Sequence, residues 1–107
     1  MHSPLHAAEC YLDPTLFGIQ RHQDEEVMSG LYKAVDRMHP NESIATLIRS
    51  QIRAYKLQEG LFGTIATKRD KSLAAPTVWW EFNASGAPEL QKFAIRILSK
   101  TSSASAC

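Results

Sequence analysis

The residue types best suited to chemistry recur near the start of the chain, where His2, His6 and Cys10 are spaced four apart. Histidine nitrogen and cysteine sulfur are common zinc ligands, and a helix would bring these positions to one face. However, Pro4 favours a helix that starts at Ser3, which leaves His2 outside it. No fourth ligand is evident in the sequence. We therefore expect no metal site, and we expect no cofactor of another kind.

Two further arrangements have the composition of catalytic sites. Cys10 with His22 or His39 would make a cysteine–histidine nucleophile, but nothing in the local sequence orients such a pair, and a small, partly buried cysteine is the simpler interpretation. Glu25 and Glu26 are paired carboxylates, and their place at the expected start of a helix explains them through the helix dipole. The sequence therefore predicts no enzyme and no small-molecule substrate.

Phosphate recognition has little support in the sequence. The stretch GLFG at residues 60–63 lacks the lysine and the strand–helix context of a phosphate loop. The 12 basic and 11 acidic residues give a formal net charge of +1, whereas nucleic-acid binders usually carry a strongly basic face. The run Lys68–Lys71 is typical of a solvated surface. Weak DNA contact stays open as an alternative, and it would use Arg49, Arg53, Lys68, Arg69 and Lys71.

The feature that most needs a role is the pair Trp79 and Trp80. Adjacent positions on a helix point about 100° apart, so we expect one indole inside a small core and the other at a protein interface, where tryptophan is enriched. The alternative is that both rings lie under neighbouring loops. In either case, indole serves packing and recognition rather than catalysis.

The elements that must position these residues are predicted to be helices. Proline, asparagine and glycine divide the chain into helices at about 4–12, 24–39, 42–59 and 77–84, one or two turns at 64–70, and a last helix from Pro88. Asn41 is the expected N-cap of the third helix, and Gly60 its C-terminal glycine. Gly30 lies inside the second helix, where glycine costs about 1 kcal/mol relative to alanine. The prediction is one small all-α domain of four to five short helices.

Two of these helices carry clear apolar stripes. The third has Ile44, Leu47, Ile48, Ile52 and Tyr55 at helical spacing, and the last has Leu90, Phe93, Ala94, Ile97 and Leu98. Each stripe is expected to face a core.

Five segments, in order along the chain, resemble hAT-family transposases of the type common in plants. They are PLHAAECYLDP at 4–14, YKLQEGLFG at 55–63, PTVWW at 76–80, GAPELQKFAIRILS at 86–99 and TSSASAC at 101–107. The family pattern at the last three is a proline, paired tryptophans, a loop, Pro-x-Leu, a helix ending in Leu-Ser, and a serine-rich turn. The resemblance spans nearly the whole chain.

The resemblance implies a division of the chain. Residues 1–71 would correspond to the helical region before the dimerisation motif, and residues 72–107 to the hAT C-terminal dimerisation motif, truncated at its end. The fold would be part of the helical insertion and the C-terminal helices of an RNase H-like transposase. The family's catalytic acids, two upstream aspartates and a glutamate after the serine-rich turn, have no counterpart in this sequence, and Glu81 and Glu89 do not match that glutamate.

The function implied by the resemblance is protein dimerisation without catalysis, with a second copy or a related hAT protein as partner. The expected packing and dimer residues are Trp79, Trp80, Phe82, Pro88, Leu90, Phe93, Ala94, Ile97 and Leu98. The alternatives are a truncated transposase that needs the missing acids, or a helical DNA-binding accessory.

The expected location is inside the cell. No signal peptide or long apolar run is present in the sequence, so we expect no membrane association. The resemblance adds a nuclear location.

Overall fold

The chain is helical throughout the residues that the structure, a computed structural model, describes, namely 4–16 and 25–100. These ranges contain six α-helices and two short 3₁₀ segments, and no β-strand. In chain order they are α1 (Pro4–Leu12), η1 (Pro14–Leu16), α2 (Glu25–Met38), α3 (Glu42–Leu57), η3 (Gly60–Gly63), α4 (Ile65–Asp70), α5 (Pro76–Asn83) and α6 (Pro88–Lys100). The all-α prediction is confirmed, with one helix more than expected because the turns at 64–70 form α4.

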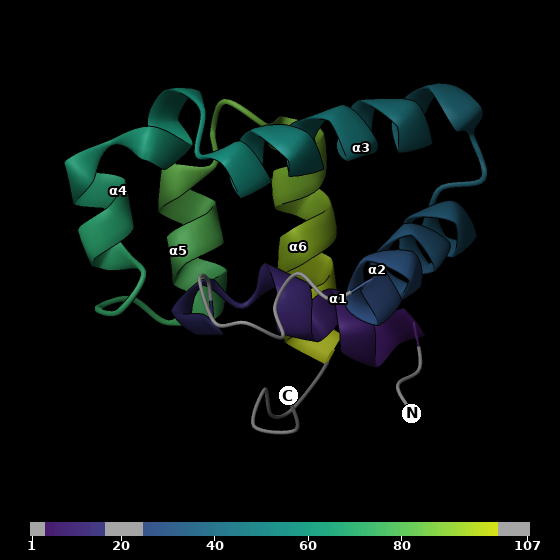
Figure 1. The fold of residues 1–107 in the computed structure, drawn as a ribbon, viewed down its shortest axis with the longest axis horizontal. Helices are drawn as coiled ribbons and strands as arrows, with labels where there is room; N and C mark the ends of the chain where they lie inside the picture. Colours follow the sequence, from purple (N-terminus) through teal and green to yellow (C-terminus); the bar gives the residue numbers. More distant parts are fainter. Residues whose placement is uncertain (1–3, 17–24, 101–107) are drawn as a thin grey trace.

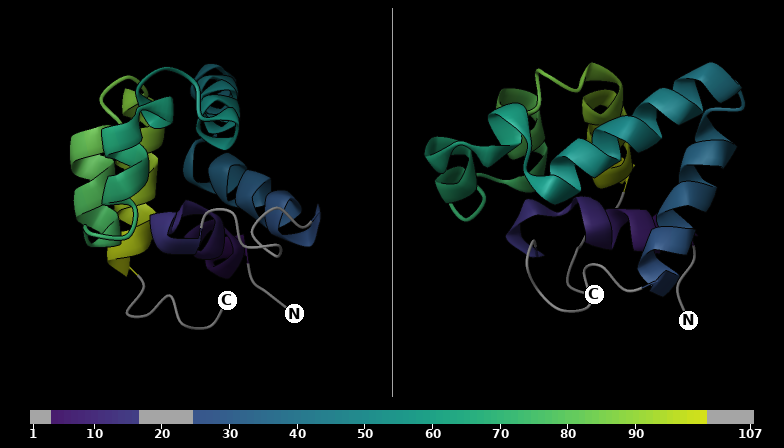
Figure 2. Two further views of the ribbon diagram at one scale, coloured as in Figure 1. Left: turned by 60° about the vertical axis from the view of Figure 1, so that its left-hand side comes forward. Right: turned by 45° about the horizontal axis from the view of Figure 1, so that its top comes forward.

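Helix α1 lies against α2 and α6, and most of it is buried. Helix α2 packs along α1, while α6 contacts α1, α3 and α5. Figure 1 shows α3 crossing one side of the molecule, with α5 and α6 running away from it next to each other. The two further views in Figure 2 show the same arrangement of helices, with α4 on the outer side of α5.

The third helix begins as predicted and ends earlier. Asn41 is its N-cap, and Asn41 Oδ1 accepts hydrogen bonds from the backbone N–H groups of Ser43 at 2.9 Å and Ile44 at 3.4 Å. At the other end the helix terminates at Gln58, which takes the left-handed conformation with φ 54°, and not at Gly60. The Gln58 N–H donates to Tyr55 O, and the Glu59 N–H donates to Ala54 O, which is a Schellman ending. The prediction for Gly60 is therefore wrong; Gly60, at φ 58°, instead opens η3.

The buried face of α3 is also narrower than predicted. Ile48, Ile52 and Tyr55 are buried together with Ala45, but Ile44 and Leu47 remain 39% and 42% exposed. The helix lies along one side of the fold, so its neighbours cover one line of side chains and leave the adjoining line in solvent.

The apolar stripe of α6 is buried as predicted. Leu90, Phe93, Ala94 and Ile97 are at most 1% exposed, and Leu98 is 9% exposed. These side chains belong to one hydrophobic cluster with residues of α1, α2, α3 and α5. Both segments implied by the resemblance, 1–71 and 72–107, thus contribute to a common core. The division itself stays a prediction.

Gly30 marks a close approach between α1 and α2. A Cβ atom at this position would lie 2.4 Å from the Cβ of Ala7 on α1, a distance at which the two helices must move apart. The absent side chain is thus what lets the two helices pack closely, and it offsets the low helix propensity of glycine.

We predict that Gly30→Ala lowers the free energy of unfolding by about 1–3 kcal/mol, because the overlap with Ala7 outweighs the gain in helix propensity. The matched control is Ser29→Ala on the exposed side of the same helix, which should stabilise the chain by a few tenths of a kcal/mol. Urea denaturation of both variants measures the difference. Stabilisation by Gly30→Ala would contradict the close approach.

Candidate functional site

Both tryptophans of α5 are fully buried, each with 0% exposure. The Trp80 indole N–H donates to the carbonyl oxygen of Leu12, the last residue of α1, at 2.6 Å. The Trp79 indole N–H donates to the carbonyl oxygen of Thr67 on α4 at 3.1 Å. The prediction that one of the two stays outside to anchor an interface is therefore wrong.

The physical reason is that α5 has neighbours on more than one side. The ring of Tyr55 lies 5.9 Å from Trp79 and 4.9 Å from Trp80, and the ring of Phe62 lies 6.1 Å from each. The aromatic side chains of α3 and η3 thus fill the angle between the two indoles. The two indoles meet edge to face with centroids 5.1 Å apart, an arrangement that aromatic rings favour.

The face of α5 that is exposed to solvent also carries apolar side chains. Phe82 is 72% exposed and Val78, one turn earlier on the same face, is 42% exposed. Of the residues expected at an interface, Phe82 and Pro88 are at the surface, and the other seven lie in the core. No local signal predicts the exposure of Phe82, because it stands three positions after Trp79, a spacing that puts two residues on neighbouring parts of one helix face.

Exposed apolar side chains concentrate in the segment around α4 and α5. Among the described residues, nine large hydrophobic side chains are exposed, and six of them come from residues 57–82, which we call the apolar segment. Its members are Leu57, Leu61, Ile65, Leu73, Val78 and Phe82. Since α4 and α5 are neighbours at one end of the molecule in Figure 1, the exposed apolar area lies toward that end. No local pattern in the sequence predicts the exposure of Ile65 and Leu73.

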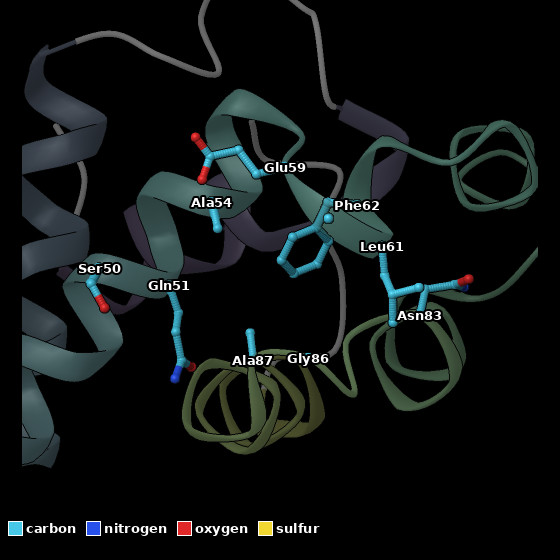
Figure 3. Close-up of a pocket in the computed structure, with 10 residues that line it drawn as sticks. Ser50, Gln51, Ala54, Glu59, Leu61, Phe62, Asn83, Gly86 and Ala87 are labelled. Carbon is cyan, nitrogen blue, oxygen red and sulfur yellow. The ribbon is translucent and has the colours of Figure 1, made fainter.

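A pocket of about 350 Å³ lies between the end of α3, η3 and the loop that joins α5 to α6. In Figure 3, Phe62 points toward Gly86 and Ala87, and Leu61 lies beside Asn83. The side-chain amide groups that line the pocket already have hydrogen-bond partners. Gln51 binds Glu89 Oε1 and the Leu90 N–H, at 2.8 Å each.

Asn83, the other amide in this pocket, donates to Asp70 Oδ2 at 2.9 Å and to the Trp79 carbonyl oxygen. The Glu59 carboxylate is turned away from Ala87 in Figure 3. The pocket thus lies beside the apolar segment, and the amide side chains that line it hold neighbouring helices together through hydrogen bonds.

Among the other residues considered for chemistry, His6 and Cys10 lie next to each other on α1, and His39 lies elsewhere. Cys10 Sγ lies 3.8 Å from His6 Nε2, and the His39 ring packs against Phe93 with centroids 5.9 Å apart. His2 and His22 lie outside the described residues. Glu25 and Glu26 are exposed in the first turn of α2, as the dipole argument predicts. Within residues 4–16 and 25–100, no cluster of three potential metal ligands occurs, and no helix has the length and apolar character to cross a membrane.

The basic residues considered for DNA contact do not form one surface. Arg49 pairs with Asp36 on α2, with Arg49 Nη2 3.0 Å from Asp36 Oδ2. Lys71 turns back toward the aromatic core, with Nζ 5.9 Å from the Tyr55 ring centroid and 6.0 Å from that of Trp79. Burial, assisted by the charge of Lys68, lowers the pKa of Lys71 to about 8. This environment was not predictable from the charged run alone.

Comparison with protein-family models, with curated proteins and with solved structures finds no match to this chain.

We predict that Trp80→Phe destabilises the fold by about 2–4 kcal/mol, because it leaves a void and removes the donor to the buried Leu12 carbonyl. Phe82→Leu, on the exposed face of the same helix, should change stability by less than about 0.5 kcal/mol. Thermal and urea unfolding of the two variants provide the comparison. Equal stability of Trp80→Phe and the parent chain would show that this hydrogen bond does not hold α5 to α1.

We also predict a pH dependence from Lys71. The lysine has a pKa of about 8 when folded and an ordinary value of 10.5, so between these pH values the unfolded chain binds more protons than the folded one. Stability therefore rises from pH 8 toward pH 10, by about 1 kcal/mol once solvent screening of a half-buried group is allowed for. Lys71→Met should abolish the rise in urea-unfolding measurements.

The rise should reverse above about pH 10. Burial raises the pKa values of Tyr11 and Tyr55 in the folded chain, so tyrosines ionise first in the unfolded chain, which favours unfolding. A flat or falling profile between pH 8 and pH 10 in the parent chain would contradict the placement of Lys71.

Proposed function

We propose that this chain is a protein-interaction module that associates with a second copy of itself, or with a related chain, through the apolar segment. The observation that carries the proposal is the exposure of Phe82 on a helix whose two tryptophans are turned inward. The inner face of α5 is fixed by packing, so an aromatic ring left 72% in solvent on the opposite face is available to a partner.

Electrostatics supports association between copies. The formal net charge of +1 gives two identical chains little mutual repulsion. Interfaces between identical chains are usually symmetric, so one patch meets the same patch on the partner. An apolar patch suits this arrangement, since identical charged side chains placed opposite each other would repel.

The resemblance to the hAT dimerisation region supports the same proposal independently of the exposed surface. The resemblance also implies a non-catalytic role, a nuclear location and related transposase-type chains as further partners. The proposal differs from the sequence expectation in one respect: the interface is placed on Phe82 and the apolar segment instead of on Trp79 and Trp80.

We predict that Phe82→Asp weakens self-association at least tenfold, since a charged side chain would have to be desolvated at the interface. The folded monomer should keep its melting temperature because Phe82 contributes little to the core. Leu47→Asp on α3 is the matched control, since Leu47 is an exposed leucine outside the apolar segment. Sedimentation equilibrium over a range of concentrations measures the dissociation constants.

A chain that stays monomeric at every concentration would contradict self-association. Equal weakening by Phe82→Asp and Leu47→Asp would contradict the placement of the interface.

A further inference from the structure

A cleft of about 360 Å³ lies between α2 and α3, and none of its lining residues belongs to the apolar segment. The two helices meet at the turn through Pro40, on the side of the molecule opposite α4 (Figure 1). Helix α2 contributes Tyr32 to the cleft, and α3 contributes Thr46, Arg49, Ser50 and Arg53. The α3 positions follow the spacing i, i+3, i+4 and i+7, so they form one polar line of two hydroxyls and two guanidinium groups.

One of the two guanidinium groups is held in place. The guanidinium carbon of Arg49 lies 4.7 Å from the Tyr32 ring centroid, and its Nη2 donates to Asp36 at 3.0 and 3.2 Å. These bonds use one nitrogen of a group that has five N–H donors. The other donors stay available on the same rigid plane.

The second guanidinium carries an uncompensated charge. Within residues 4–16 and 25–100, Arg53 has no acidic partner within ion-pair distance, and it is exposed. Thr46 is exposed one turn before Arg49 and two turns before Arg53 along α3, and its hydroxyl can serve as an additional donor. The cleft therefore combines one oriented guanidinium, one adaptable guanidinium and the Thr46 hydroxyl, while the Ser50 hydroxyl already donates to the Leu47 carbonyl oxygen at 2.7 Å.

This donor set matches a tetrahedral oxyanion, because guanidinium forks and hydroxyl groups are the usual ligands of phosphate oxygens. We propose that the cleft between α2 and α3 binds the phosphate monoester of a phosphorylated serine or threonine in a partner protein segment. This site is separate from the apolar segment and does not depend on the proposed self-association.

The observations favour a single phosphate over a nucleic-acid backbone. A backbone binder needs a continuous basic track that contacts several phosphates. Here the other basic cluster, Lys68 and Arg69, belongs to α4 at the far end of the molecule, and Asp36 places a carboxylate beside the cleft. Two guanidinium groups next to one carboxylate leave one net positive charge, which attracts a single phosphate group but does not make a track.

The test is an NMR titration of the full chain with three probes at fixed ionic strength. They are a capped Ala-phosphoserine-Ala peptide, the same peptide without phosphate, and inorganic phosphate. We expect the phosphopeptide to shift the amide signals of residues 46–53 with a millimolar or tighter dissociation constant. The unphosphorylated peptide should leave these signals unchanged.

Three variants locate the site. Arg53→Gln should weaken phosphopeptide binding about tenfold, in line with the loss of one charge-assisted contact. Asp36→Asn should strengthen it severalfold by removing the neighbouring negative charge. Arg96→Gln, an exposed arginine on α6, changes the net charge by the same amount as Arg53→Gln and should leave binding unchanged.

Several outcomes would overturn the proposal. Binding that does not depend on the phosphate, or equal weakening by Arg53→Gln and Arg96→Gln, would exclude a specific cleft. Inorganic phosphate binding as tightly as the phosphopeptide would exclude a protein segment as the ligand. Tighter binding of a duplex DNA, with strong salt dependence, would assign the arginines to nucleic acid instead.

Discussion

The fold depends on where two indole N–H groups find their acceptors. Buried tryptophan requires a hydrogen-bond partner, and here the partners are the carbonyl groups of Leu12 and Thr67. One bond joins α5 to the end of α1, 68 positions away in the sequence, and the other joins it to α4. The tryptophan pair thus links the first helix, the short helix α4 and the C-terminal part of the chain around one aromatic cluster.

This constraint also determines which surfaces are available. Since α5 must present Trp79 and Trp80 to the core, Val78 and Phe82 must face outward. The short helix α4, held to α5 by the Trp79 bond and by Asn83, leaves Ile65 in solvent as well. The polar cleft between α2 and α3 arises from a different cause: α3 lies along the side of the fold and buries one line of side chains, so Arg49 and Arg53 remain accessible.

Much of the secondary structure could be predicted from local signals. The bounds of α1, α2 and α6 follow from proline and from the acids at helix starts, and the Asn41 cap is where its sequence position indicates. The end of α3 was missed because Gln58 adopts a left-handed conformation that glycine usually provides. The burial of both tryptophans could not be predicted because α5 has neighbours on several sides: α1, α3, η3 and α4 surround its inner half.

The sequence by itself determined the helical class, the positions of most helices and the inward stripe of α6, because helix periodicity and capping are local properties. It also provided the resemblance to the hAT dimerisation region. Only the tertiary structure decided that both indoles are buried and that Phe82 is exposed. The tertiary structure likewise decided the half-buried position of Lys71 over aromatic rings. It also decided the cleft that Tyr32 forms with the arginines of α3. These features depend on contacts between helices that are distant in the sequence, which no local pattern specifies.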